Sequence, residues 1–174
     1  WENVNLRPLM KFQTPIIVEN EANAAALGEK NFGVGRNITD MIYVSVGIGV
    51  GCGIIIENRL FSGTSFNAGE FGHMTIDPEG PACKCGKRGC WEVFASNKAA
   101  LNRYKEKSGL DLDEFDDFVQ RVIDGDKIAL EVMDEITKYI GIGIGNIVNG
   151  LNPQMVVIGG KLTEAKDILY DKVF

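Results

Sequence analysis

The 174-residue sequence predicts an α/β fold in which helices cover a mixed central sheet. Short β-branched segments alternate along the chain with longer segments in which apolar residues recur at helical spacing, and such alternation is typical of α/β proteins. Two of the β-branched segments are joined by a glycine-rich turn, which adds an antiparallel pair. We therefore expect strands of both directions in one sheet.

The first predicted elements are a strand, a polar turn and a helix. Residues 15–18 form a short β-branched run, and residues 19–21 are its exit turn. The Ala-rich residues 22–30 predict a helix with Asn20 as its cap, because an asparagine oxygen can accept a hydrogen bond from the first turn. This order places polar side chains at the carboxyl end of a sheet, where α/β proteins form clefts.

Two further strands are predicted at residues 41–46 and 54–56, joined by the glycine-rich residues 47–53. Alternate glycines either form a tight hairpin between buried strands or bring backbone amides close to a phosphate. The residues leave both interpretations open. Cys52 lies inside this apolar run, so we expect it to be a small core residue rather than a metal ligand.

The second half of the chain is predicted to be mostly helical. The expected helices cover residues 96–107 with Ser96 as the cap, residues 113–124, and the long periodic pattern from residue 126 to 151. A strand at residues 155–158 then runs into a pair of glycines.

Three glycines lie inside the long helical pattern: Gly141, Gly143 and Gly145. Each costs about 1 kcal/mol relative to alanine in a helix interior, so their presence needs a reason. They allow either close packing of the helix against a neighbour or the approach of a bulky ligand to its backbone.

Composition and charge exclude several classes of protein. No apolar run approaches the roughly 20 residues that span a bilayer, and no secretory signal opens the chain, so we expect a cytoplasmic protein without membrane contact. The net charge of -6 argues against a nucleic-acid-binding surface. Three of the four cysteines fall within eight positions, which favours a metal site in a reducing compartment over a disulfide framework.

The residues that could hold this metal cluster between positions 73 and 90. Zinc favours four tetrahedral ligands from Cys and His, and the chain offers His73, Cys83, Cys85 and Cys90. Glycines at positions 86 and 89 would let the loop fold tightly around the ion. With all four positions filled by protein, the zinc would be structural and not hydrolytic. The alternative is a reduced loop with free thiols.

Two acids, Glu70 and Glu92, bracket the metal cluster. If one ring nitrogen of His73 binds zinc, the other must be an N–H donor, and such donors normally find an oxygen partner. In a cleft that partner could be a sugar hydroxyl, and otherwise it would be a backbone carbonyl. The residues alone leave both open.

Five stretches of the chain match a known family. They are residues 18–29, the glycine-rich residues 45–55, the Gly-Glu-Phe-Gly-His of residues 69–73, the Cys-x-Cys-Gly-x-x-Gly-Cys-x-Glu of residues 83–92, and residues 152–160. On these motifs the sequence resembles the ROK family of bacterial sugar-responsive repressors and sugar kinases. The resemblance implies an actin-like ATPase, ribonuclease-H-like fold with two lobes and sugar bound between them.

The resemblance also implies a domain organisation and a set of sugar contacts. Residues 15–174 would be the sugar-binding effector lobe, truncated at both ends relative to the family, and residues 1–14 the end of a preceding lobe or a linker. The residues implied to hydrogen-bond the sugar hydroxyls are Asn20, Glu21, Glu70, His73 and Glu92. The zinc would order the loop that carries three of these contacts.

Two departures from the family kinases favour a repressor. Those kinases carry Asn-Asp where this chain has Asn20-Glu21, and the Asp takes the proton from the attacking hydroxyl. The longer Glu side chain moves the carboxylate by about 1 Å, which can cost on the order of 100-fold in rate. The kinases also usually carry Gly-Thr-Gly where this chain has Ile48 between two glycines. The Glu form of the motif is similar to that of the xylose-type repressors.

We therefore expect the sugar-sensing domain of a repressor, with xylose or a related sugar as inducer and no catalytic residue. The family resemblance implies a homodimer, and DNA contact only through a helix-turn-helix domain that this chain lacks. The alternative is an ATP-dependent, glucokinase-like sugar kinase, with Glu21 as the base and ATP phosphates held by Gly47, Gly49 and Gly51. A zinc-stabilised binding module without a sugar function is a third candidate.

Overall fold

The computed structural model describes residue 4 and residues 7–10, 12–166 and 168–169. In these residues, helices are layered on the two faces of one sheet. Four strands pair in the order β3-β2-β1-β4: β1 is Met41–Val46, β2 is Val50–Ile56, β3 is Arg59–Leu60 and β4 is Met155–Gly159. The helices are α1 (Glu21–Phe32), α2 (Glu92–Ala95), α3 (Asn97–Ser108), α4 (Phe115–Ile123) and α5 (Lys127–Leu151). Short 3-10 turns are η1 (Arg7–Leu9), η2 (Glu70–His73) and η3 (Lys161–Ala165).

The sheet is mixed, as the sequence predicts. Strand β1 pairs antiparallel with β2 and parallel with β4. Strand β2 begins at Val50, four residues before the predicted start, because the hairpin turn takes only residues 47–49 and the residues after it pair with β1. The glycine-rich segment is therefore both a tight turn and the first part of a strand.

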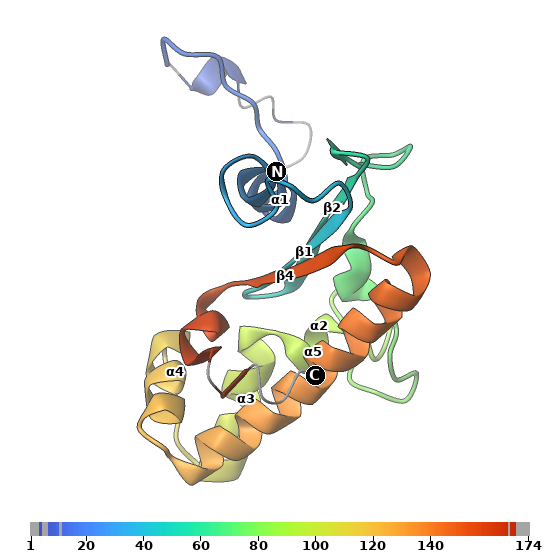
Figure 1. Ribbon diagram of the computed structural model, residues 1–174. Helices are drawn as coiled ribbons and strands as arrows, with labels where there is room; N and C mark the ends of the chain where they lie inside the picture. Colours follow the sequence, from blue (N-terminus) through green and yellow to red (C-terminus); the bar gives the residue numbers. More distant parts are fainter. Residues whose placement is uncertain (1–3, 5–6, 11, 167, 170–174) are drawn as a thin grey trace.

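Helices cover the two faces of the sheet unequally. Helix α1 lies on one face, and α3, α4 and α5 lie on the other (Figure 1). Alternate residues of β1 supply the two cores: Ile42, Val44 and Val46 face the large core beneath α3, α4 and α5, whereas Met41 and Tyr43 join the small cluster under α1. The period-2 alternation of a strand explains why one short segment serves both layers.

The predicted helices are confirmed, with small differences at their ends. Asn20 caps α1, its side-chain oxygen accepting from the Ala22 N–H at 2.9 Å. Ser96 caps α3 in the same way, accepting from the Ala99 N–H at 3.3 Å. Helices α4 and α5 begin within two residues of the predicted positions, and β4 ends one residue after its predicted end.

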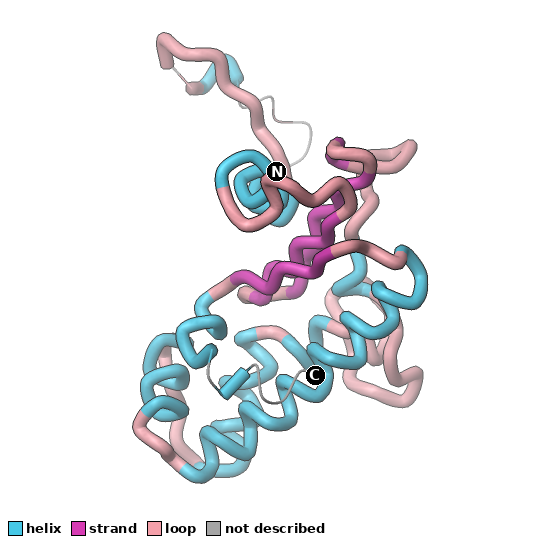
Figure 2. The backbone as a smooth tube through the Cα atoms, in the orientation of Figure 1, coloured by secondary structure: helices cyan, strands magenta, loops and turns pink. Residues whose placement is uncertain are grey.

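The predicted strand at residues 15–18 is wrong. These residues form no regular element (Figure 2), and Ile17 is 83% exposed. The segment belongs to none of the paired strands of the described sheet, and Ile17 and Val18 are exposed, so it lacks the packed face that stabilises β-branched residues in a strand. Of the predicted linker at residues 1–14, residues 1–3, 5–6 and 11 lie outside the described residues; the domain assignment therefore stays a prediction. The same holds for the end of the predicted effector lobe, because residues 167 and 170–174 are also outside.

One glycine of α5 is explained by close packing. The fully buried Trp91 lies against the helix, where its indole Nε1–H donates to the Tyr139 carbonyl at 2.7 Å. A Cβ on Gly143, one turn further along, would lie 2.0 Å from the Trp91 ring. The packing interpretation therefore holds at this position, whereas a Cβ on Gly145 would meet no atom within 4 Å.

In the part of the chain that the structure describes, every helix is too short or too polar to span a membrane.

Two alanine substitutions in α5 test this packing. Gly143→Ala should lower the free energy of unfolding by about 1–3 kcal/mol, because Trp91 must move to admit the methyl group. Gly145→Ala, in the same helix with open space around it, should raise stability by up to about 1 kcal/mol. Denaturant unfolding of both variants measures the difference. Equal effects of the two substitutions would contradict the proposed role of Trp91.

Candidate metal centre and adjoining recess

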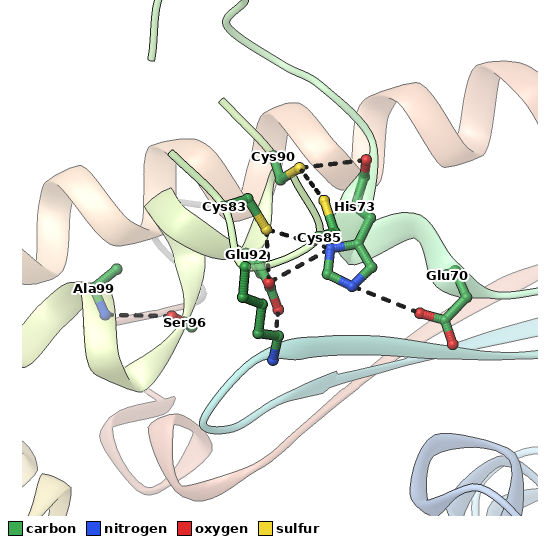
Figure 3. A network of polar contacts seen from close by, with 9 residues as sticks. Glu70, His73, Cys83, Cys85, Cys90, Glu92, Ser96 and Ala99 are labelled. Atoms are coloured by element: carbon green, nitrogen blue, oxygen red, sulfur yellow. Dashed lines mark hydrogen bonds and ion pairs between the residues drawn. The ribbon is translucent and has the colours of Figure 1, made fainter. Parts of the chain in front are cut away.

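The four predicted metal ligands converge at one point between η2 and the start of α2 (Figure 3). The ligand atoms of His73, Cys83, Cys85 and Cys90 all lie within 4.8 Å of one another. Cys83 Sγ is 3.6 Å from His73 Nδ1, and Cys85 Sγ is 3.5 Å from Cys90 Sγ. In a tetrahedral zinc site with Zn–S near 2.3 Å and Zn–N near 2.0 Å, any two ligand atoms lie roughly 3.5–3.8 Å apart. The residues therefore fit a zinc ion.

The loop that carries the cysteines folds tightly, as predicted. Gly86 and Gly89 both adopt left-handed backbone conformations, with φ of 90° and 63°. The Cys83 N–H donates to the Lys87 carbonyl at 2.8 Å, which closes the turn that holds Cys85. An isolated bridge between Thr75 and Cys90 brings the end of the loop back beside its beginning.

The thiols differ in acidity. Burial raises the pKa of the Cys83 thiol to about 12, whereas the backbone N–H of Lys87 lowers the pKa of Cys85. Zinc binds thiolates, so metal binding would displace protons from this cluster. Cys52 lies outside the cluster, and burial raises the pKa of its thiol to about 12 as well. It is 3% exposed within the large core, which confirms the expectation of a core residue.

Two glycines seat η2 directly on strand β2. The Cys52 N–H donates to the Gly69 carbonyl at 3.1 Å. A Cβ on Gly69 would lie 2.0 Å from the Cys52 carbonyl oxygen, and one on Gly72 would lie 1.9 Å from the Val50 carbonyl oxygen. Only residues without a Cβ allow this backbone-to-backbone approach, and it fixes where the side chains of η2 point.

His73 lies between two carboxylates. Glu92, whose side chain is 10% exposed, places Oε1 at 3.4 Å from His73 Nδ1 and accepts from Cys83 Sγ at 3.1 Å. Glu70, on the outer side, places Oε2 at 4.0 Å from His73 Nε2. Lys84 Nζ lies 3.8 Å from the second oxygen of Glu92. The array is thus acid, imidazole, acid, with the thiols of Cys83, Cys85 and Cys90 on the side of the imidazole away from Glu70 (Figure 3).

The two ring nitrogens of His73 face different surroundings. Nδ1 points to the thiols and is the nitrogen placed to bind a metal. Nε2 faces the Glu70 carboxylate, at a distance beyond a direct hydrogen bond. Among the described residues, no backbone carbonyl accepts from this ring. The Nε2 side of the ring therefore faces the Glu70 carboxylate, whereas the Nδ1 side faces the thiols.

A recess that opens to solvent adjoins Glu70. Its lining comes from α1 and the α1 cap, from β2, from the β3–η2 loop, and from η2 and the η2 cap: Asn20, Asn23, Gly51, Cys52, Phe66, Ala68, Gly69 and Glu70. The recess brings two predicted sugar contacts, Asn20 and Glu70, to a common space.

The other predicted site residues lie nearby with partners of their own. Glu21 Oε1 accepts from the Ser45 hydroxyl at 3.5 Å, at the end of β1, and Glu21 is not among the recess lining. Gly49 lies under Glu92, where a Cβ would come 2.7 Å from the carboxylate, whereas Gly51 lines the recess. Gly47 is held by the Asn97 N–H, which donates to its carbonyl at 2.8 Å.

Sequence reasoning missed three residues at this site. Asn23 is a buried polar residue in the first turn of α1, and its position three residues after Asn20 was an available signal. Lys84 sits between two cysteines, where its pairing with Glu92 could not be foreseen. Phe66 lines the recess from a segment with no regular structure, and no pattern pointed to it.

The comparisons with known proteins identify a family for the chain. The model of the ROK family matches residues 1–174. The xylose repressor of Bacillus spizizenii is 40% identical over 99% of this chain and 45% of its own length, and the glucokinase of Halalkalibacterium halodurans is 38% identical over 97% and 56%. The chain thus spans about half the length of the curated relatives it matches.

A solved structure shares the fold. The ROK family glucokinase from Streptomyces griseus, in complex with glucose and AMPPNP, superposes with a TM-score of 0.84 at 31% identity. The match covers 91% of this chain and 56% of the other. The actin-like fold expected from the sequence is confirmed by this likeness.

Removing one ligand tests the metal centre. The purified protein should contain about one zinc per chain, and Cys90→Ser should lose most of it because a tetrahedral site loses one of its four ligands. Cys52→Ala removes a cysteine outside the cluster and should keep the metal. Elemental analysis and thermal unfolding with and without a chelator measure both. A zinc-free protein of unchanged stability would rule out the structural role.

Proposed function

This chain belongs to the ROK family, and from that premise we propose that it is the sugar-sensing effector domain of a transcriptional repressor. The inducer would be xylose or a related sugar, and the zinc site would be structural. The observation that carries the proposal is the acid–imidazole–acid array of Glu70, His73 and Glu92 beside an open recess.

The array has the chemistry that a sugar requires. A carboxylate can accept from two hydroxyls at once, and charge-assisted hydrogen bonds are stronger than neutral ones. A hydroxyl to one side of these two atoms, within hydrogen-bond reach of both, would donate to Glu70 and accept from His73 Nε2, which lie 4.0 Å apart. Asn20, which lines the same recess, would contact the sugar as well.

The metal would act through the shape of the loop. Bound by four protein ligands, a zinc ion supplies a rigid crosslink and has no open position for a reactant. His73 would bind it through Nδ1 and thereby have its Nε2–H fixed toward the sugar. Glu92 follows the last ligand, Cys90, by two positions, so its place depends on the same fold of the loop.

Two residues favour sensing over phosphorylation. Glu21, where the family kinases carry the catalytic aspartate, has its carboxylate engaged by Ser45. Ile48 is 85% exposed at the tip of the β1–β2 hairpin, where a hydroxyl-bearing residue would be expected to meet a phosphate. Neither change removes a group from the acid–imidazole–acid array.

Induction requires that the sugar bind one arrangement of the protein more tightly than another. In our proposal, the sugar shifts the relative positions of two lobes, and a homodimer transmits that shift to its DNA-binding domains. DNA contact would come from a helix-turn-helix domain outside this chain, in the cytoplasm. The similarity to a xylose repressor supports this assignment.

An ATP-dependent sugar kinase is the second candidate. The glucokinase relative is nearly as similar as the repressor, at 38% against 40% identity, and the superposed glucokinase was solved with glucose and AMPPNP. The hairpin glycines at positions 47, 49 and 51 are also present. In this alternative Glu21 would be the base and the hairpin would contact phosphates.

A sugar titration of the full-length protein tests the first proposal. Calorimetry with xylose, glucose and N-acetylglucosamine should show one preferred sugar, and Glu70→Gln or Glu92→Gln should weaken its binding by about tenfold or more, because each removes a charged acceptor. Glu79→Gln, in the same loop but exposed and outside the array, should bind as the unmodified protein does. Zinc content should stay constant in all three variants. Unchanged binding in Glu70→Gln and Glu92→Gln would refute the assigned contacts.

A coupled assay with ATP separates the two candidates. Sugar kinases turn over at about 1–100 per second, and we expect the full-length protein to stay far below that range with each of the three sugars. Glu21→Gln serves as the control, because it removes the only base assigned under the kinase alternative. Turnover in the kinase range that disappears in Glu21→Gln would establish the kinase instead.

A further inference from the structure

We propose that the aromatic ring of Phe66 is a platform on which one face of the bound sugar rests. The inference rests on the proposed function, because it assigns an additional contact in the same recess. Phe66 lines that recess together with Asn20 and Glu70, and yet it is 82% exposed. An aromatic side chain in a recess wall with most of its surface in water is placed to be covered by a ligand.

The backbone of Phe66 supports this assignment. In the described residues, four positions other than glycine have positive φ: Glu57, Asn58, Phe66 and Asn152. Glu57 and Asn58 form the turn between β2 and β3, and Asn152 is the left-handed cap of α5. Phe66, with φ of 60°, serves neither a hairpin turn nor a helix cap.

The loop does not need an aromatic residue at this position. It closes through the Ala68 N–H, which donates to the Ser62 carbonyl at 3.1 Å. Where such a turn requires one left-handed residue, glycine or asparagine adopts that conformation with the least strain. A bulky residue in that conformation is a genuine outlier, and such outliers gather at ligand sites. Both the left-handed backbone and the exposed ring of Phe66 lower the stability of the protein when no ligand is bound.

The chemistry of a sugar ring matches this arrangement. The hydroxyls of a pyranose lie around its rim, whereas the C–H groups of its ring form apolar patches on the faces. In the recess, Glu70 supplies an acceptor for the rim, and Phe66 supplies an apolar surface for one face. Ligand pockets commonly combine an apolar wall with a few polar groups that fix orientation. Aromatic side chains provide large contact area at little entropic cost.

Substitution of Phe66 tests the platform without breaking the fold. Phe66→Asn removes the ring but suits the left-handed backbone, so its melting temperature should equal or exceed that of the unmodified protein. Its affinity in the titration with D-xylose, D-glucose and N-acetylglucosamine should fall by about fivefold to tenfold, whereas Phe66→Tyr should stay within about twofold. The matched control is Phe32→Asn, which removes a ring that is 87% exposed at the end of α1 and outside the recess.

A fluorescent reporter gives an independent reading of the contact. In Phe66→Trp, saturating sugar should change the emission of the new indole, because the ligand replaces water against it. Phe32→Trp should show no such change. If the unmodified protein and Phe66→Asn bind sugar equally, the platform is wrong and the proposed function stands. If the unmodified protein binds none of the sugars, both are overturned.

Discussion

The positions of Glu70 and His73 depend on the backbone contact between η2 and β2. The Gly69 carbonyl accepts from the Cys52 N–H, and no side chain separates the two segments at Gly69 or Gly72. The positions of Glu70 and His73 are therefore set by the sheet rather than by a loop of independent shape. Because β2 is held between β1 and β3, Glu70 and His73 are attached to a rigid part of the sheet.

The other end of the metal-binding loop is anchored to the helical layer. Trp91 is fully buried, hydrogen-bonded to the Tyr139 carbonyl and packed on Gly143. The residue before it is the candidate metal ligand Cys90, and the residue after it is Glu92. The loop is thus fixed to the sheet at its start and to α5 at its end, and a zinc ion would join the two ends directly. This arrangement explains how an exposed, glycine-rich segment can hold carboxylates at defined positions.

Sequence reasoning succeeded where the determining contacts are local. The candidate metal ligands fall within eighteen positions, and the helices show their periodicity and caps. The strand expected at residues 15–18 failed because a β-branched run carries no information on whether a sheet edge is available to it. The recess could not be foreseen because it joins segments from α1, β2 and the β3–η2 loop. The left-handed backbone of Phe66 was equally invisible, since sequence signals for that conformation come from glycine and asparagine.

The capping role of Asn20 has a consequence for which ligands the recess accepts. Its side-chain oxygen is engaged by the Ala22 N–H, so the group it offers a ligand is chiefly its amide NH₂, a donor. The ionised carboxylate of Glu70, on the same recess, can only accept. Asn20 and Glu70 therefore offer a ligand opposite kinds of hydrogen bond, one chiefly donating and the other accepting. A hydroxyl group can satisfy either residue because it is donor and acceptor at once, whereas an ammonium could not accept from Asn20 and a carboxylate could not donate to Glu70.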